Sequence, residues 1–163
     1  MDNRRRRAFG AIAGLLAVTA VIAGATSAVG ATTAGRADRG TVYFAPTHQV
    51  GSLGYYAGDS SDKITGPGAI VYQLKVLATT KPGTLNVDVK KVTAYSATGS
   101  LIGTATAKLT ILDSKGNATL SDGVVKFTRG TGGQAGHTLT AKFAGKGNVK
   151  IGAYKLNYTG TYK

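Results

Sequence analysis

The sequence has 163 residues, with 20 Lys and Arg against 7 Asp and Glu, a formal net charge of +13 and no cysteine. A chain of this length can form one domain with a substantial core but not two. The lack of cysteine excludes disulfide bonds and any zinc or nucleophile chemistry that depends on thiolates.

The N-terminal residues have the three zones of an export signal. Arg4–Arg7 are positively charged, residues 8–24 are uncharged and rich in Ala, Gly, Leu, Val and Ile, and residues 25–34 are small. An uncleaved membrane anchor needs about 20 strongly apolar residues, and this stretch is shorter and diluted by glycine; the other alternative is a buried core helix. We therefore predict a signal-peptide helix over residues 1–31 and a secreted or extracytoplasmic protein.

The export route is a second expectation from the same residues. Arg6-Arg7-Ala8-Phe9 resembles the core of a twin-arginine signal, which would mean export of the folded protein. The flanking residues fit that motif poorly, and a run of four arginines contains a twin arginine by chance. General secretion is therefore favoured over the twin-arginine route.

Removal of the signal leaves a strongly basic chain with sixteen Lys and Arg, six Asp and no Glu, and a net charge of about +10. Residues 32–40 have no apolar period, and we predict a flexible leader there. The folded domain is expected over residues 41–163, beginning with a short strand at Thr41–Ala45 that stops at Pro46. Residues 47–68 look the least regular, because they contain six glycines or prolines and a polar run.

The middle of the chain alternates with a period of two, which is typical of strands with one buried face. Residues 69–78 alternate clearly, and residues 85–89 do so in the same way. The phase then shifts, and a β-bulge at Lys90–Lys91 would explain the shift. In residues 101–112 the small Gly103, Ala105 and Ala107 share a face, which suits a crowded barrel interior.

The last third is rich in threonine, valine and tyrosine, the residue types that favour strands. Glycine-containing segments at 122–123, 130–133 and 146–148 are typical of turns. They divide the region into four expected strands: Ala118–Leu120, Gly123–Arg129, His137–Ala144 and Asn148–Tyr162.

The total is seven or eight strands at intervals of about 10–20 residues, which indicates an all-β barrel or sandwich. Successive hairpins favour a single antiparallel up-and-down β-barrel, because closure leaves no exposed edge strand. A β-sandwich is the alternative.

Three segments of the second half resemble the allene oxide cyclase/dirigent type of β-barrel: residues 97–104, residues 120–125 and the glycine-threonine-glycine turn in residues 129–136. Members of that group bind phenolic radicals or unstable lipid epoxides inside the barrel, using buried acidic groups. This chain has no glutamate, and Asp88 is the only aspartate inside an expected strand. What the resemblance implies here is therefore the fold, while a cyclase-like or isomerase-like activity is an alternative.

No residue pattern predicts catalytic, cofactor or metal chemistry. His48 and His137 have no carboxylate or serine at a telling distance in the sequence, so both are expected to be structural. The oxygen-rich run at residues 59–62 lacks the ligand count and spacing of a calcium loop. The glycines at residues 130–136 precede no helix whose N-terminus would hold a phosphate, so they are expected to form a turn.

The tyrosines are the one candidate binding feature. Tyr72, Tyr95, Tyr154 and Tyr158 could line a cavity whose aromatic walls contact a small apolar ligand. The alternative is core and rim packing, since tyrosine is favoured in strands and small barrels fill their interiors with side chains.

The positive charge has two interpretations. Outward lysines solubilise the strands and discourage edge pairing, or they attract anionic envelope polymers or acidic lipid. No basic cluster with interleaved aromatic residues indicates specific nucleic-acid binding. We expect an exported non-enzymatic barrel that is envelope-associated or binds a small apolar ligand; a barrel enzyme and a structural or adhesive surface protein are the alternatives.

Overall fold

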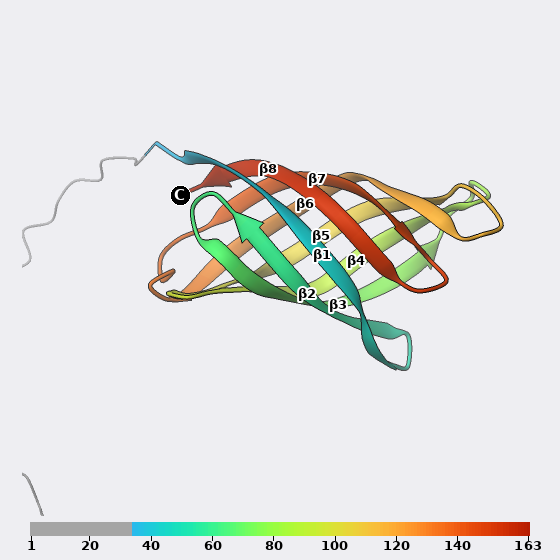
Figure 1. Cartoon of the computed structure of the whole chain (residues 1–163), viewed down its shortest axis with the longest axis horizontal. Helices are drawn as coiled ribbons and strands as arrows, with labels where there is room; N and C mark the ends of the chain where they lie inside the picture. Colours follow the sequence, from blue (N-terminus) through green and yellow to red (C-terminus); the bar gives the residue numbers. More distant parts are fainter. Residues whose placement is uncertain (1–33) are drawn as a thin grey trace, which may run out of the picture. The chain divides into compact units, whose positions relative to one another are not determined.

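The structure is a computed structural model that describes residues 34–163. The predicted signal peptide, residues 1–31, lies outside the described residues, which consist of strands and their connections. In chain order the strands are β1 (Arg36–Val50), β2 (Leu53–Asp62), β3 (Gly66–Ala78), β4 (Thr84–Ser96), β5 (Gly99–Ile111), β6 (Asn117–Gly132), β7 (Leu139–Asn148) and β8 (Ala153–Tyr162) (Figure 1). Residues 34–163 contain no helix that could span a membrane.

The eight strands form one closed barrel in which every strand pairs antiparallel with its neighbours in the sequence. β1 closes the barrel by pairing with β8 as well as β2, with Val42 opposite both Leu156 and Ser60. The predicted all-β, antiparallel up-and-down barrel is thus confirmed, with eight strands, and the alternative of a sandwich was wrong.

The two ends of the barrel differ in what they carry. We call the end where β1 begins and β8 ends the terminal end; it also holds the connections at residues 63–65, 97–98 and 133–138. The opposite end, called the distal end, holds the turns at residues 51–52, 79–83, 112–116 and 149–152. In Figure 1 the terminal end is on the left, beside the C-terminus, and the distal end is on the right.

The period of two places the core inside the barrel, as the sequence predicts. In β3, Ile70, Tyr72 and Leu74 are buried and face inward. In β5, Ala105 and Ala107 are buried on the same face. Each strand contributes only every second residue to the interior, and small side chains at these positions leave space there.

The predicted bulge in β4 is confirmed. The pairing of β4 with β5 shifts between Val89 and Val92, and both of these valines are buried. Two consecutive residues, Lys90 and Lys91, therefore stay exposed between two inward positions.

Several expected boundaries were wrong. β1 begins at Arg36, so residues 36–40 belong to the barrel and not to a leader. Residues 47–62, expected to be irregular, complete β1 and form β2. In the last third, the turn between β7 and β8 was expected at residues 146–148 but lies at residues 149–152.

Residues 122–123 are a bulge within β6 and not a turn, which is a further correction. The pairing of β6 with β7 shifts between Leu120 and Gly123, so that one extra residue is accommodated on β6. Asp122 has a φ of 51°, the only positive φ of a non-glycine residue in the described part of the chain. Left-handed backbone at one position lets the strand continue after a kink, and β6 is therefore a single strand of 16 residues.

Candidate functional site

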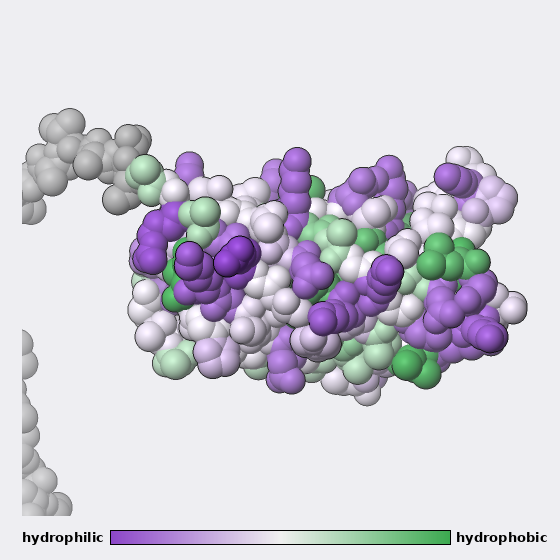
Figure 2. All heavy atoms as spheres, turned by 45° about the horizontal axis from the view of Figure 1, so that its top comes forward, coloured by the Kyte–Doolittle hydropathy of each residue, from purple (hydrophilic) through white to green (hydrophobic). Residues whose placement is uncertain are grey.

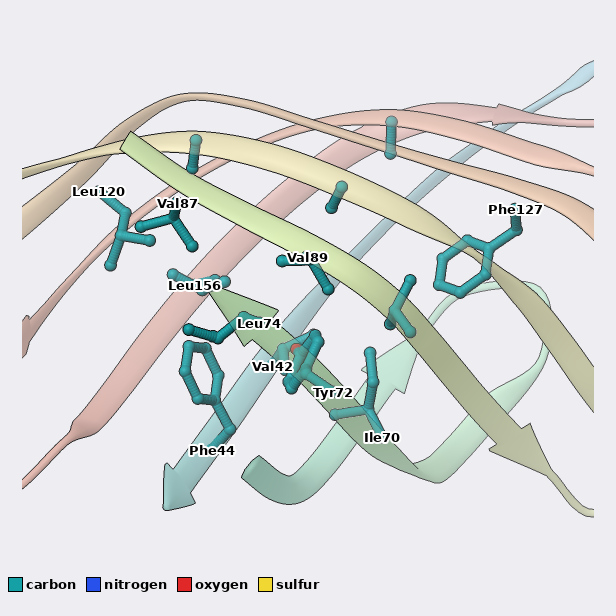
Figure 3. Close-up of a cluster of buried hydrophobic side chains, with 14 of the residues drawn as sticks. Val42, Phe44, Ile70, Tyr72, Leu74, Val87, Val89, Leu120, Phe127 and Leu156 are labelled. Atoms are coloured by element: carbon teal, nitrogen blue, oxygen red, sulfur yellow. The ribbon is translucent and has the colours of Figure 1, made fainter. Parts of the chain in front are cut away.

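A cavity of about 90 Å³ lies inside the barrel. Most of its lining is aliphatic or aromatic, contributed by strands around the whole barrel, among them Val42, Ile70, Val89, Leu101 and Phe127. Figure 3 shows several of these side chains pointing from their strands into the enclosed space. Ala105 and Ala107 also line the cavity. Their side chains are too small to fill it.

An aromatic cluster bounds the cavity on the side of the distal end. The ring of Phe44 lies 4.9 Å from that of Tyr72, 5.3 Å from that of Tyr154 and 5.8 Å from that of Tyr56, measured between centroids. Such tilted, edge-on and stacked pairs are the favoured arrangements of aromatic rings. Phe44 and Tyr72 form part of the cavity wall, while Tyr56 and Tyr154 pack behind them.

The polar part of the lining lies toward the terminal end. Ser60 and Asp62 come from the end of β2, Thr65 from the connection that follows, and Ser96 from the end of β4. The carboxylate of Asp62 accepts hydrogen bonds from the backbone N–H groups of Ile64 and Thr65 and from the Thr65 hydroxyl. The cavity thus has an apolar body and polar groups toward the terminal end of the barrel, a part that we call its mouth.

A second carboxylate lies behind this mouth. Asp38 of β1 is only 4% exposed, and it accepts hydrogen bonds from the Arg39 backbone N–H at 2.9 Å and from the Tyr158 hydroxyl at 3.3 Å. The Tyr158 ring reaches across β1 because residue 40 is glycine; a Cβ there would come within 2.7 Å of that ring. Tyr158 lines the cavity while Asp38 does not, so Tyr158 separates the buried carboxylate from the cavity.

Burial dominates the electrostatics of this group. Burial raises the pKa of Asp38, and the nearby negative charge of Asp62 raises it further. Burial also raises the pKa of Tyr158, again with added effects of Asp62 and Asp38. The Tyr158 phenol therefore remains protonated at neutral pH and acts as a hydrogen-bond donor between two carboxyl groups.

The connection between β6 and β7 covers part of the terminal end. Gln134 of this segment is buried and lines the cavity. Its amide nitrogen donates to the Thr98 hydroxyl at 3.0 Å, and its amide oxygen accepts from the Tyr162 hydroxyl at 2.7 Å. Both ends of the amide are therefore satisfied inside the barrel, which holds this connection in place.

The four tyrosines predicted to form a cavity do not all lie in it. Tyr72 and Tyr158 line it from the interior of the barrel. Tyr95 lines only its edge and is 49% exposed, because it follows the inward Ala94 and points the other way. Tyr154 faces inward but packs against Phe44 behind the cavity wall. The predicted set thus mixes wall, rim and core.

Sequence reasoning missed Asp38, Asp62 and Gln134. Asp38 has the inward parity of Val42 and Phe44, and this period of two was the signal that could have revealed it. Asp62 shares the inward parity of Ser60 on β2. Gln134 lies in a connecting segment, where no periodicity applies.

The remaining candidate residues make local contacts. His137 bonds through Nδ1 to the Lys163 carbonyl at 3.0 Å and stacks on Tyr162, and His48 stacks on Tyr55. The glycine-rich residues 130–136 end β6 and form a turn. In the described part of the chain no group of three or more His, Cys, Asp or Glu side chains could hold a metal ion.

Comparison of the chain with family models, curated proteins and solved structures finds no match.

Proposed function

We propose that the chain is an exported, non-enzymatic β-barrel protein that binds a small apolar molecule in its interior. The observation that carries this proposal is the cavity with an aliphatic and aromatic body and polar groups at one end. Binding sites for small molecules are typically concave and mostly apolar, with a few polar groups that fix orientation. The order of charged, apolar and small residues at the N-terminus supports export.

The size of the cavity limits the ligand. Sites for drug-sized molecules measure about 300–1,000 Å³, and an engineered cavity of about 150 Å³ holds benzene or xenon. At about 90 Å³, this cavity accepts an apolar group of only a few heavy atoms. A hydroxyl or amine on the ligand would find acceptors at the mouth, in Asp62 and Ser60.

A barrel enzyme acting on an apolar substrate is the second candidate, and the buried Asp38 is the observation that favours it. A carboxyl group with a raised pKa, next to a phenol that lines a cavity, has the properties of a general acid or base. Asp38 itself does not reach the cavity, since Tyr158 lies between them. Binding without chemistry therefore remains the leading proposal.

Association with the cell envelope is the other part of the proposal. Its support is the excess of about ten positive charges after residue 31, which favours attraction to anionic polymers or acidic lipid. The remaining alternative is a structural or adhesive surface protein, for which the cavity would have no role.

Native mass spectrometry of protein purified from the medium of its own host tests the binding proposal. We expect the wild type to carry an additional small mass. Ala105→Leu, which fills the cavity, should lose it, while Ala144→Leu, which adds the same group at an exposed strand position, should keep it. Thermal unfolding of both variants checks that they are folded. The same mass on all three proteins, or on none of them, would contradict ligand binding in the cavity.

A further inference from the structure

Most of the exposed large hydrophobic side chains of the described residues lie at the distal end. Nine large hydrophobic side chains are exposed in residues 34–163. Six of them lie at the distal end: Val50, Val76, Leu77, Ile111, Leu112 and Ile151. The three most exposed are Val50 at 58%, Leu112 at 60% and Ile151 at 67%. Each of these three lies in or next to a turn, at the extreme of the barrel.

These side chains lie beyond the packed interior of the barrel. Val76 follows the inward positions of Leu74 and Tyr72 but is 44% exposed, because β3 extends past the packed interior. Ile111 continues the inward face of β5 beyond Leu109 and is exposed as well. Apolar groups clustered on the surface of a small domain indicate an interaction site more often than single exposed residues do.

Contacts between neighbouring segments join three of the four distal turns, those at residues 79–83, 112–116 and 149–152. The Ile111 backbone N–H donates to the Gly83 carbonyl at 2.8 Å, and the Val149 backbone N–H donates to the Gly116 carbonyl at 2.8 Å. The Asn148 side chain donates to the Lys115 carbonyl at 3.1 Å. Figure 2 shows hydrophobic and strongly hydrophilic side chains side by side at this end, on the right.

The charges at the two ends differ. The distal turns and the four strand residues next to each of them contain one carboxylate, Asp113, and seven lysines: Lys75, Lys81, Lys108, Lys115, Lys146, Lys150 and Lys155. Counted in the same way, the terminal end has six cationic side chains and three carboxylates, Asp38, Asp59 and Asp62. Both ends therefore have a net positive charge, and the distal end combines the larger one with apolar tips.

We propose that the distal end docks on an anionic lipid bilayer, with Val50, Leu112 and Ile151 entering the interface and the lysines contacting the head groups. Membrane attachment of this kind needs two signals that act together, buried apolar groups and attraction to anionic lipid. A soluble anionic polymer would use the lysines but would gain nothing from the apolar tips. Docking in this orientation leaves the mouth of the cavity, at the terminal end, facing away from the membrane.

This inference deepens the proposed envelope association, on which its setting in the cell rests, and it is independent of ligand binding in the cavity. The sequence has no cysteine, so single introduced cysteines can be labelled with a polarity-sensitive fluorophore. Ser114→Cys places the label on an exposed distal turn, and Ala97→Cys places it on an exposed turn at the terminal end. Any contribution of residues 1–33 is the same in both proteins.

The labelled full chains are mixed with vesicles of phosphatidylcholine alone or with added phosphatidylglycerol. We expect a blue shift of the Ser114→Cys label on the anionic vesicles only, and no shift of the Ala97→Cys label. Combined Val50→Ser, Leu112→Ser and Ile151→Ser substitutions should weaken this interaction at least tenfold. Val71→Ser, an exposed position on the side of the barrel, should change it less than twofold.

Two results would overturn the docking inference. Equal responses of the two labels on anionic vesicles, with affinity that depends on salt but not on the tip substitutions, would indicate diffuse attraction, and the envelope association would stand without the oriented docking. Absence of binding to anionic vesicles and to isolated envelopes at low salt, where the Debye length is longest, would remove both. Neither result affects the test for a bound ligand.

Discussion

Among single residues, Asp38 has the most unusual environment. It is a buried carboxyl group in the interior of a barrel whose inward positions are otherwise mostly apolar. Its two hydrogen-bond donors, the Arg39 backbone N–H and the Tyr158 hydroxyl, stabilise the charge in part. Burial has a larger effect than these hydrogen bonds, so the pKa of Asp38 is raised. The charged form is therefore less favourable in the folded protein than in the unfolded chain.

The raised pKa of Asp38 predicts a pH-dependent effect of Asp38→Asn on stability. An acid with a raised folded-state pKa contributes stability that is fully present below its ordinary pKa of 3.8 and is lost as the pH rises through the raised value. Asparagine keeps an acceptor oxygen and cannot ionise. The variant should therefore have a higher Tm than the wild type at pH 7, and the gap should close toward pH 3.8. Thermal unfolding over this pH range measures it.

Asp59→Asn, at an exposed position on β2, controls for the change in net charge. A variant Asp38→Asn that is less stable than the wild type at pH 7 would show that the hydrogen bonds to the Asp38 carboxylate outweigh the cost of its burial.

Among the strands, β6 depends on one backbone irregularity. The bulge at Asp122 shifts the register against both β5 and β7, so that residues on either side of it still alternate correctly. The Asp122 side chain forms an exposed ion pair with Lys108 at 2.9 Å, and such pairs contribute little to stability. The backbone conformation, and not the ion pair, is what this position requires.

Comparison of Asp122→Gly with Asp122→Ala isolates that requirement. Both substitutions remove the ion pair, but only glycine adopts a φ of 51° without steric cost. The free energy of unfolding should therefore be higher for the glycine variant, by about 1 kcal/mol. Chemical denaturation of the two proteins measures this difference. Equal stabilities would show that residue 122 does not hold a left-handed conformation in solution.

Strand composition also explains how much the sequence could predict. In β3 and β5 the inward positions are apolar or small and the period of two is clear, so these strands were predicted well. β1 and β2 have Asp38, Gly40, Ser60 and Asp62 at inward positions. These residues surround the mouth of the cavity and the Tyr158 ring, and their polarity hid the strand pattern.

The candidate site was predictable to a similar extent. Tyr72 and Tyr158 followed from the parity of their strands, because inward aromatic residues in a barrel contact its interior. The depth of a residue along the barrel axis depends on the register between strands, which the sequence alone did not provide. For this reason Tyr154, at the level of Phe44, could not be separated from the residues of the cavity wall.

The barrel differs chemically between its two ends. The terminal end contains Asp38, Asp59, Asp62 and the mouth of the cavity, and the distal end contains apolar tips and an excess of lysine. A closed barrel has no exposed edge strand, so its two ends are the places where new surface features can be added without changing the sheet. Ligand binding at one end and membrane contact at the other are compatible for this reason.

Methyl NMR under xenon pressure tests most directly whether the interior accepts a guest, since xenon occupies dry apolar cavities. We predict saturable shifts for methyl groups that line the cavity, such as those of Val89 and Leu101, and no saturable shift for the exposed Leu112. Ala105→Leu should abolish the shifts and Ala144→Leu should preserve them. Non-saturable shifts of equal size at lining and exposed methyl groups, in the wild type as in Ala105→Leu, would show that the barrel is filled by its own side chains.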